Sequence, residues 1–255
     1  MNQTAPGTVY LVPAPLDFGC KSQTPLDQVM PGGTLRTAAA LHHWICENAK
    51  TTRAYLKRIG DIYPLCDSLQ ALDLQELPRE IHKKGDHLGS FDVRYLLQPA
   101  LNGKNMGLVS EAGMPAVADP GSSVVRAAHE LGLPVVPLVG PVSVLLALAA
   151  SGLNGQNFAF VGYVPSTPAE RHQRLQALES LALKTGQTQL FIETPYRNTA
   201  LLQALLQALQ HNTRLATSSA LTMSQATCYS DLVKNWKHRP WTLDNATPTV
   251  FAIGR

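Results

Sequence analysis

Three loops rich in proline and glycine hold the residues whose types and spacing suit ligand binding. They are VPAPLDFG (12–19), SEAGMPAVADPGSS (110–123) and VGPVSVLLALAASGLNG (139–155). The first two follow apolar runs that predict buried strands, and the third begins at the end of such a run. In open α/β sheets a ligand lies beyond the carboxyl ends of the strands. Because glycine has no Cβ and proline fixes φ, such loops bring backbone amides and carbonyls close to a ligand. Plain turn chemistry explains any one loop, but the three together predict a small-molecule pocket.

Other common site motifs are missing from the sequence. There is no G-x-G-x-x-G, Walker, H-E-x-x-H or G-x-S-x-G pattern. The four cysteines lie far apart without a C-x-x-C pair, which favours free thiols over a disulfide framework or zinc site. His42 and His43 are adjacent, and in a helix neighbouring side chains diverge by about 100°. We therefore expect no metal site.

Alternating apolar runs and helical patterns predict the elements that carry these loops. Continuous apolar runs predict strands that are covered on both faces. They lie at 8–13, 106–111, 134–139, 158–164, 188–193, 214–221 and 247–254, with a further, closely following run at 227–233. Helical patterns cover 34–59 (as one helix or two), 90–103, 122–132, 168–184 and 198–210. This alternation predicts an α/β fold, with a largely parallel sheet in the first half and a mixed sheet in the second.

Composition sets the broad class of the protein. Hydrophobic residues make up 45% of the 255 residues, charged residues 15%, and the formal net charge is +3. This is an ordinary globular balance, and the charge alone does not indicate nucleic acid. The N-terminal segment lacks the pattern of a signal peptide. The apolar stretch 135–153 is broken by Pro137, Gly140 and Pro141, which favours a buried strand, a turn and a helix over a membrane span. We expect a cytoplasmic protein with no membrane contact.

Four ordered motifs add a family resemblance that covers most of the chain. They are SEAGMPAVADPG (110–121), PLVGPVS (137–143), GYVP (162–165) and ETPYR (193–197). Together they resemble the tetrapyrrole methylase superfamily of S-adenosylmethionine-dependent methyltransferases. Within it, the similarity is greatest to the branch of ribosomal RNA small-subunit methyltransferase I, which methylates a cytidine ribose 2′-oxygen in 16S rRNA.

The resemblance implies a two-lobed fold, with lobes at 1–120 and 121–255 and S-adenosylmethionine in the cleft between them. It also implies a homodimer whose partner is rRNA or the 30S subunit. The implied cofactor-binding residues lie on the three loops: Pro13, Ala14, Pro15, Ser110, Glu111, Ala112, Gly113, Met114, Pro115, Asp119, Gly140, Pro141, Val142 and Ser143.

Methyl transfer to a hydroxyl requires close, collinear positioning and benefits from a general base. Glu47, expected on a helix, and Glu193 are the catalytic candidates, ahead of Glu111 and Asp119, the latter expected to shape a turn or cap a helix. Arg53 and Arg197 are the implied substrate-binding residues. The basic clusters that could contact RNA phosphates are Arg53, Lys57, Arg58 and the Lys83–Lys84 pair.

Two other functions stay open. One is the same chemistry on a small molecule such as a tetrapyrrole, since the chain is only mildly basic. The other is a non-catalytic S-adenosylmethionine-binding protein, because the segments at 13–20, 46–50, 85–92 and 222–247 depart from the family pattern.

Overall fold

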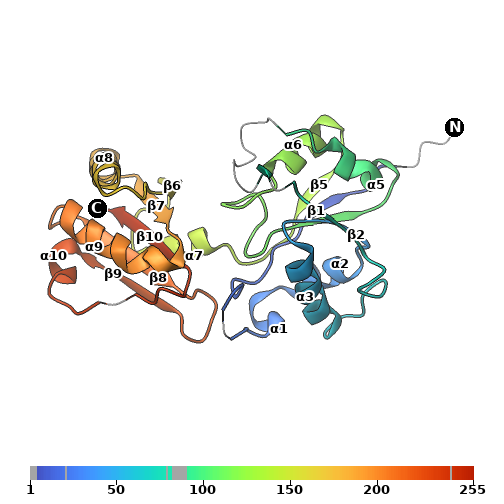
Figure 1. Ribbon diagram of the computed structural model, residues 1–255, viewed down its shortest axis with the longest axis horizontal. Coiled ribbons are helices and arrows are strands. Elements are labelled where there is room, and N and C mark those ends of the chain that lie inside the picture. Colours follow the sequence, from blue (N-terminus) through green and yellow to red (C-terminus); the bar gives the residue numbers. More distant parts are fainter. Residues whose placement is uncertain (1–4, 21, 79, 82–90, 242) are drawn as a thin grey trace. The chain divides into compact units, whose positions relative to one another are not determined.

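The computed structural model describes residues 5–20, 22–78, 80–81, 91–241 and 243–255 (Figure 1). The described residues form two compact units. The first holds residues up to Phe18 together with Thr24–Pro141, and the second holds Gly19–Gln23 together with Val142–Arg255. The boundary predicted at 120/121 therefore differs from the observed one at 141/142. The helix and the strand that follow residue 121 belong to the first unit. The strand forms one edge of the first sheet, and the helix covers one of its faces.

The first unit is built on a five-stranded parallel sheet with the order β3-β2-β4-β1-β5. Its strands are β1 (Val9–Leu11), β2 (His43–Cys46), β3 (Asp73–Glu76), β4 (Met106–Val109) and β5 (Val135–Pro137). Its helices are α1 (Leu26–Val29), α2 (Gly32–Ala39), α3 (Ala49–Gly60), η1 (Arg94–Leu97), α5 (Gln98–Leu101) and α6 (Ser122–Glu130). The parallel arrangement predicted for this half is confirmed.

Helices cover both faces of this sheet, which explains its continuous apolar strands. Along β2, Trp44 packs with α1, α2 and α3 on one face. The next residue, Ile45, packs with η1, α5 and α6 on the other. Gly107 in β4 makes room for the Trp44 indole, since a Cβ at 107 would lie 2.5 Å from a ring carbon. Small and large side chains thus alternate between neighbouring strands to keep the helices close to the sheet.

The prediction of helix over 34–59 is partly wrong, because strand β2 separates α2 from α3. The apolar residues Leu41, Trp44 and Ile45 have helical spacing, but Trp44 and Ile45 point to opposite faces of the sheet. Asn48 then begins α3, and its side chain accepts hydrogen bonds from the amides of Lys50 (2.9 Å) and Thr51 (3.2 Å).

The second unit contains a five-stranded mixed sheet with the order β6-β7-β10-β8-β9, in which only the β6–β7 pair is parallel. Its strands are β6 (Phe158–Tyr163), β7 (Thr188–Ile192), β8 (Arg214–Ser219), β9 (Thr227–Leu232) and β10 (Thr249–Gly254). Its helical elements are α7 (Ser143–Ser151), α8 (Pro168–Thr185), η2 (Pro195–Arg197), α9 (Asn198–Ala208) and α10 (Val233–Trp236). The predicted mixed sheet is confirmed.

Two helix layers also cover this second sheet. Phe191 and Phe251 point to the side of α8 and α9. Their neighbours Leu190 and Ala252 point to the opposite side, where α7 packs. None of the helices among the described residues is long and apolar enough to cross a membrane.

Candidate functional site

Three loops of the first unit meet at one edge of its sheet. Strands β4, β1 and β5 are adjacent and parallel, so their carboxyl ends lie at the same edge. Segment 12–18 follows β1, segment 110–121 follows β4 and segment 138–141 follows β5. This is the edge at which open α/β sheets bind ligands. The first two segments match the predicted loops, whereas only the start of the third predicted loop (139–155) lies here, because Ser143–Ser151 form helix α7 of the second unit.

Backbone hydrogen bonds join the first two loops. The Ala14 amide donates to the Gly113 carbonyl at 2.8 Å, and the Gly113 amide donates to the Ala14 carbonyl at 2.9 Å. Gly113 has a φ of +71°, which a residue with a side chain rarely adopts. Its backbone thus reaches Ala14 in a conformation that explains the glycine at this position.

The third loop is held against the first by close packing. A Cβ at Gly140 would lie 2.6 Å from the Pro13 Cβ, so only glycine allows this approach. The Thr34 hydroxyl of α2 donates to the Val139 carbonyl at 2.7 Å. The Tyr55 hydroxyl of α3, which covers the same face of the sheet, donates to the Pro13 carbonyl of the first loop at 2.8 Å. The helices that cover this face therefore fix the backbone of both loops.

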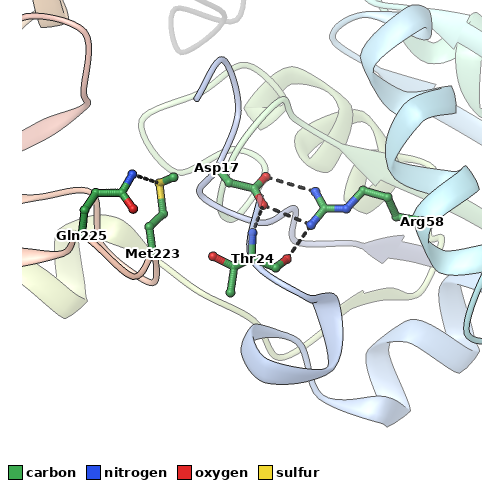
Figure 2. Close-up of polar contacts among 5 residues, drawn as sticks. All are labelled: Asp17, Thr24, Arg58, Met223 and Gln225. Atoms are coloured by element: carbon green, nitrogen blue, oxygen red, sulfur yellow. Dashed lines mark hydrogen bonds and ion pairs between the residues drawn. The ribbon is translucent and has the colours of Figure 1, made fainter. Parts of the chain in front are cut away.

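A buried ion pair holds the end of the first loop (Figure 2). Asp17 is 3% exposed, and both of its carboxylate oxygens accept hydrogen bonds from the Arg58 guanidinium at 3.1 Å. The Thr24 amide donates to Asp17 at 3.0 Å, and Arg58 donates to the Thr24 carbonyl at 2.7 Å. Arg58, predicted as part of a basic cluster that could contact RNA, is instead committed to Asp17.

The second loop contains four residues with positive φ. Besides Gly113 and Gly121, these are Ala116 and Ala118, both at +65°. The left-handed region costs a residue with a Cβ about 1 kcal/mol or more. Ala116 is held there by a hydrogen bond from its amide to the Pro120 carbonyl at 3.2 Å. Such strained conformations gather at functional loops, whose surroundings hold them in place.

Glu47, which follows strand β2, makes a hydrogen bond with the 110–121 loop. It follows Cys46, which pairs with Val109 of β4, so Glu47 lies beside the start of the 110–121 loop. Its carboxylate accepts a hydrogen bond from the Glu111 amide at 3.2 Å, and the Glu111 carboxylate accepts one from the Thr51 hydroxyl at 3.1 Å. The expectation that Glu47 lies on a helix is wrong, because it lies in the connection between β2 and α3.

Asp119 is not the N-cap residue of helix α6, because Gly121 holds that position. Instead, burial and the negative charges of Glu47 and Glu111 raise the pKa of Asp119 to about 7, despite a hydrogen bond with Ser110 that lowers it. Three carboxylates thus gather at the carboxyl edge of the sheet, and Asp119 is partly protonated at neutral pH.

Replacing Asp119 by asparagine is expected to stabilise the protein at alkaline pH. The pKa of Asp119 is raised from 3.8 to about 7, so the folded state binds its proton more tightly and loses stability as pH rises through this interval. At pH 8 the neutral Asp119→Asn variant avoids this cost, which is about 2–4 kcal/mol at roughly 1.4 kcal/mol per pK unit. Urea unfolding at pH 8 and pH 4 measures it, and the two proteins should converge at pH 4.

The control for this substitution is Asp92→Asn. Asp92 is exposed, and hydrogen bonds from Arg94 lower its pKa, so removing its charge gives no alkaline stabilisation. Parallel pH profiles for wild type and Asp119→Asn would show that Asp119 is ionised without cost in the folded protein.

The remaining predicted residues are distributed over both units. Pro13, Ala14, Pro15, Ser110–Pro115, Asp119, Gly140 and Pro141 belong to the first unit, whereas Val142 and Ser143 belong to the second. Arg53 is an exposed residue of α3. Lys83 and Lys84 lie outside the described residues.

The two catalytic candidates lie in different units. Glu193 follows β7 in the second unit, where its Oε1 lies 2.8 Å from the Nη2 of Arg197. The same oxygen accepts hydrogen bonds from the amide and hydroxyl of Thr194. The structural pairing of Glu193 with Arg197 is therefore present, and their catalytic and substrate-binding roles stay predictions.

Sequence reasoning missed the roles of Tyr55 and Arg58. They are three residues apart on α3 and so lie on the same helix face, where both contact the 12–18 loop. The signal that could have found them is the Asp in VPAPLDFG, an acidic residue in an apolar loop that needs a cationic partner when it is buried.

Comparisons with known proteins indicate the family of this chain. The family model for tetrapyrrole (corrin/porphyrin) methylases matches residues 34–235. Ribosomal RNA small subunit methyltransferase I of Micromonospora olivasterospora is 33% identical over 205 residues, or 80% of this chain and 56% of that protein. The protein of the same name from Mesorhizobium japonicum is 31% identical over 188 residues, or 74% of this chain and 57% of that one. The chain thus spans about half the length of the curated relatives it matches.

A solved structure shows the same fold. Uroporphyrin-III-C-methyltransferase from Thermus thermophilus matches with a TM-score of 0.51 and 18% identity, covering 97% of this chain and 94% of that one. The family model covers well over half of the sequence, including the second and third loops of the site. The chain therefore belongs to the tetrapyrrole (corrin/porphyrin) methylase family.

Proposed function

We propose that this protein is an S-adenosylmethionine-dependent methyltransferase that acts on ribosomal RNA of the small subunit, at a ribose 2′-oxygen of 16S rRNA. The convergence of the three loops at the carboxyl edge of the first sheet, joined at Ala14 and Gly113, carries this proposal. The family and the names of the relatives from Micromonospora olivasterospora and Mesorhizobium japonicum support the reaction and the substrate class.

The residues present fit the proposed cofactor. Gly140 and Gly113 let the three loops approach one another closely, which brings their backbone groups together at this edge. Glu47 and Glu111, together with Asp119 when it is ionised, supply negative charge there, which complements the positively charged sulfonium and ammonium groups of S-adenosylmethionine. The segments that would hold it are 13–15, 110–115 and 140–141. When bound, S-adenosylmethionine supplies a methyl carbon with a good leaving group.

The chain's own contribution is to hold its loops in place and to accept a proton. Backbone bonds and the Glu47–Glu111 contact fix the segment 110–115 at the sheet edge, which favours a reaction that depends on orientation. The ribose hydroxyl must lose its proton as it becomes an ether, and a carboxylate is a suitable acceptor. We assign this role to Glu47, which lies with Asp119 in the carboxylate cluster.

Binding and transfer assays test this proposal together. We expect calorimetry to detect S-adenosylmethionine binding by the wild type, and methyl label to enter 16S rRNA in 30S subunits from a methylation-deficient strain. Glu47→Gln should lower kcat about 100-fold or more, the usual range for general base catalysis, a larger effect than its change in cofactor affinity. If it loses cofactor affinity but keeps the kcat of the wild type, Glu47 only positions the Glu111 amide.

Other results of these assays would refute separate parts of the proposal. Absence of binding heat and of a thermal shift at millimolar S-adenosylmethionine would refute cofactor binding and hence the methyltransferase proposal. Label that enters only small molecules would refute the RNA substrate and favour a tetrapyrrole-like acceptor. Binding without transfer to any acceptor would indicate a non-catalytic binding protein. Assembly as a homodimer is part of the same proposal and is supported by the family resemblance alone.

A further inference from the structure

Two exposed tyrosines lie at the same edge of the second sheet. Strands β6 and β7 are parallel, and Tyr163 at the end of β6 is in register with Ile192 at the end of β7. Four residues after Ile192, η2 carries Tyr196. Tyr163 is 59% exposed and Tyr196 is 69% exposed, so both rings are accessible to a ligand. Two exposed aromatic rings therefore lie at the carboxyl ends of the parallel strands β6 and β7.

The backbone presents Tyr163 outward through an irregularity in β6. The register between β6 and β7 shifts between Phe160 and Tyr163, and Gly162 in this bulge has a φ of +73°. Bulges of this kind redirect the side chain that follows them. A Cβ at Gly162 would meet no atom within 4 Å, so it is the backbone conformation that requires glycine here. The exposed position of Tyr163 is therefore built into the strand.

A buried carboxylate fixes the position of Tyr196. The Arg197 guanidinium carbon lies 5.4 Å from the centre of the Tyr196 ring, a cation–π distance. The Nη2 of Arg197 lies 2.8 Å from the Oε1 of Glu193, whose side chain is fully buried. The Nε of Arg197 donates a hydrogen bond to the Thr194 hydroxyl at 3.1 Å. Both anchors fix the guanidinium, so the ring of Tyr196 is oriented while most of its surface stays exposed.

Arg197 also keeps hydrogen-bonding capacity. Its Nη2 and Nε are engaged, but its Nη1 has no partner among the described residues. An ordered, exposed aromatic ring beside an arginine with free donors matches the chemistry of proteins that bind single-stranded RNA, in which bases stack on aromatic rings and arginine contacts acceptors.

We propose that Tyr163 and Tyr196 form a stacking surface for unpaired bases of an RNA substrate, with Arg197 contacting the same strand. This inference rests on the proposed function and adds to it the residues of the second unit that bind the RNA. Unpaired rather than duplex RNA is the occupant, because only splayed bases offer their faces for stacking.

Binding of a labelled single-stranded RNA oligonucleotide, followed by fluorescence anisotropy, tests the proposal. Tyr196→Ala and Tyr163→Ala should each weaken binding about tenfold, in the range found when one stacked base is lost. Tyr196→Phe, which keeps the ring, should bind within about twofold of the wild type. Because stacking is not ionic, Tyr196→Ala should leave the slope of log Kd against log salt unchanged, whereas Arg197→Ala should reduce it.

Tyr95→Ala is the matched control. Tyr95 is 60% exposed on η1 in the first unit, so its replacement removes the same ring from a different surface and should leave binding unchanged. Wild-type affinity in Tyr196→Ala, or an equal loss in Tyr95→Ala, would overturn the stacking surface. Weaker methylation of 30S subunits with unchanged binding of the oligonucleotide would overturn it in favour of a protein contact.

The proposed function fails separately from this inference. Methyl transfer and S-adenosylmethionine binding by the wild type decide the function, whereas the tyrosine variants compare RNA affinities at unchanged cofactor affinity. A wild type that methylates 16S rRNA but binds no single-stranded oligonucleotide would refute the stacking surface alone.

Discussion

Replacing Gly140 by alanine is expected to weaken the binding of S-adenosylmethionine substantially. The new Cβ would overlap the Pro13 ring, 2.6 Å from its Cβ, and would also lie 3.4 Å from the Met30 side chain. Pro13 cannot retreat easily, because its carbonyl accepts the Tyr55 hydrogen bond and the next residue is joined to Gly113. The 138–141 loop must therefore move away from the 12–18 loop, and both are proposed to contact the cofactor.

The expected size of this effect is at least tenfold in affinity, with a loss of about 1–3 kcal/mol in the free energy of unfolding, which is typical of overpacking. Calorimetric titration with S-adenosylmethionine measures the first quantity, and urea unfolding measures the second. A variant that is destabilised but binds the cofactor normally would show that the third loop does not line the site.

Gly33→Ala is the control for Gly140→Ala. Gly33 lies in α2 of the same unit, where a Cβ would meet no atom within 4 Å. Alanine favours a helix over glycine by about 0.5–1 kcal/mol. This control should therefore bind the cofactor normally and be as stable as the wild type or slightly more stable.

The strands and loops of the site were predictable because their signals are local. Continuous apolar runs such as TVYLVP and MGLVSE indicate buried parallel strands, and the rule that ligands bind at their carboxyl ends placed the loops. The two strands that were missed lack this signal. HWIC (43–46) has apolar residues at helical spacing, and DLQE (73–76) is a half-exposed strand at the sheet edge with polar residues.

The parts of the site that could not be predicted depend on tertiary contacts. Nothing in AVADPG indicates that Ala116 and Ala118 adopt positive φ, since alanine disfavours that region and only the folded loop imposes it. Likewise, Asp119 precedes Pro-Gly, which suggests a turn. Its raised pKa, however, arises from burial and from the charge of Glu47, which lies 72 positions earlier in the chain. A unit boundary also depends on which helices pack on which sheet, and α6 packs on the first.

Replacing Arg58 by methionine is expected to cause the largest loss of stability. The substitution keeps much of the side-chain volume but leaves the carboxylate of Asp17, which is 3% exposed, without its cation (Figure 2). Breaking a buried ion pair by removing one partner costs about 3–5 kcal/mol, because the remaining charge stays buried. Urea unfolding followed by circular dichroism measures this loss, and calorimetry should show weaker S-adenosylmethionine binding, since the 12–18 loop loses its anchor.

A double-mutant cycle separates the ion pair from the packing of the Arg58 side chain. Asp17→Asn removes the buried charge, so the double variant Asp17→Asn/Arg58→Met should be more stable than Arg58→Met alone, with a coupling of about 1–3 kcal/mol. Arg53→Met is the matched control, because Arg53 lies on the same helix but is exposed, and it should change stability by less than about 0.5 kcal/mol. Equal losses in Arg58→Met and Arg53→Met would contradict the anchoring role. The ion pair joins α3 to the loop that carries Ala14, so its loss links the stability of the fold directly to the geometry of the proposed cofactor site.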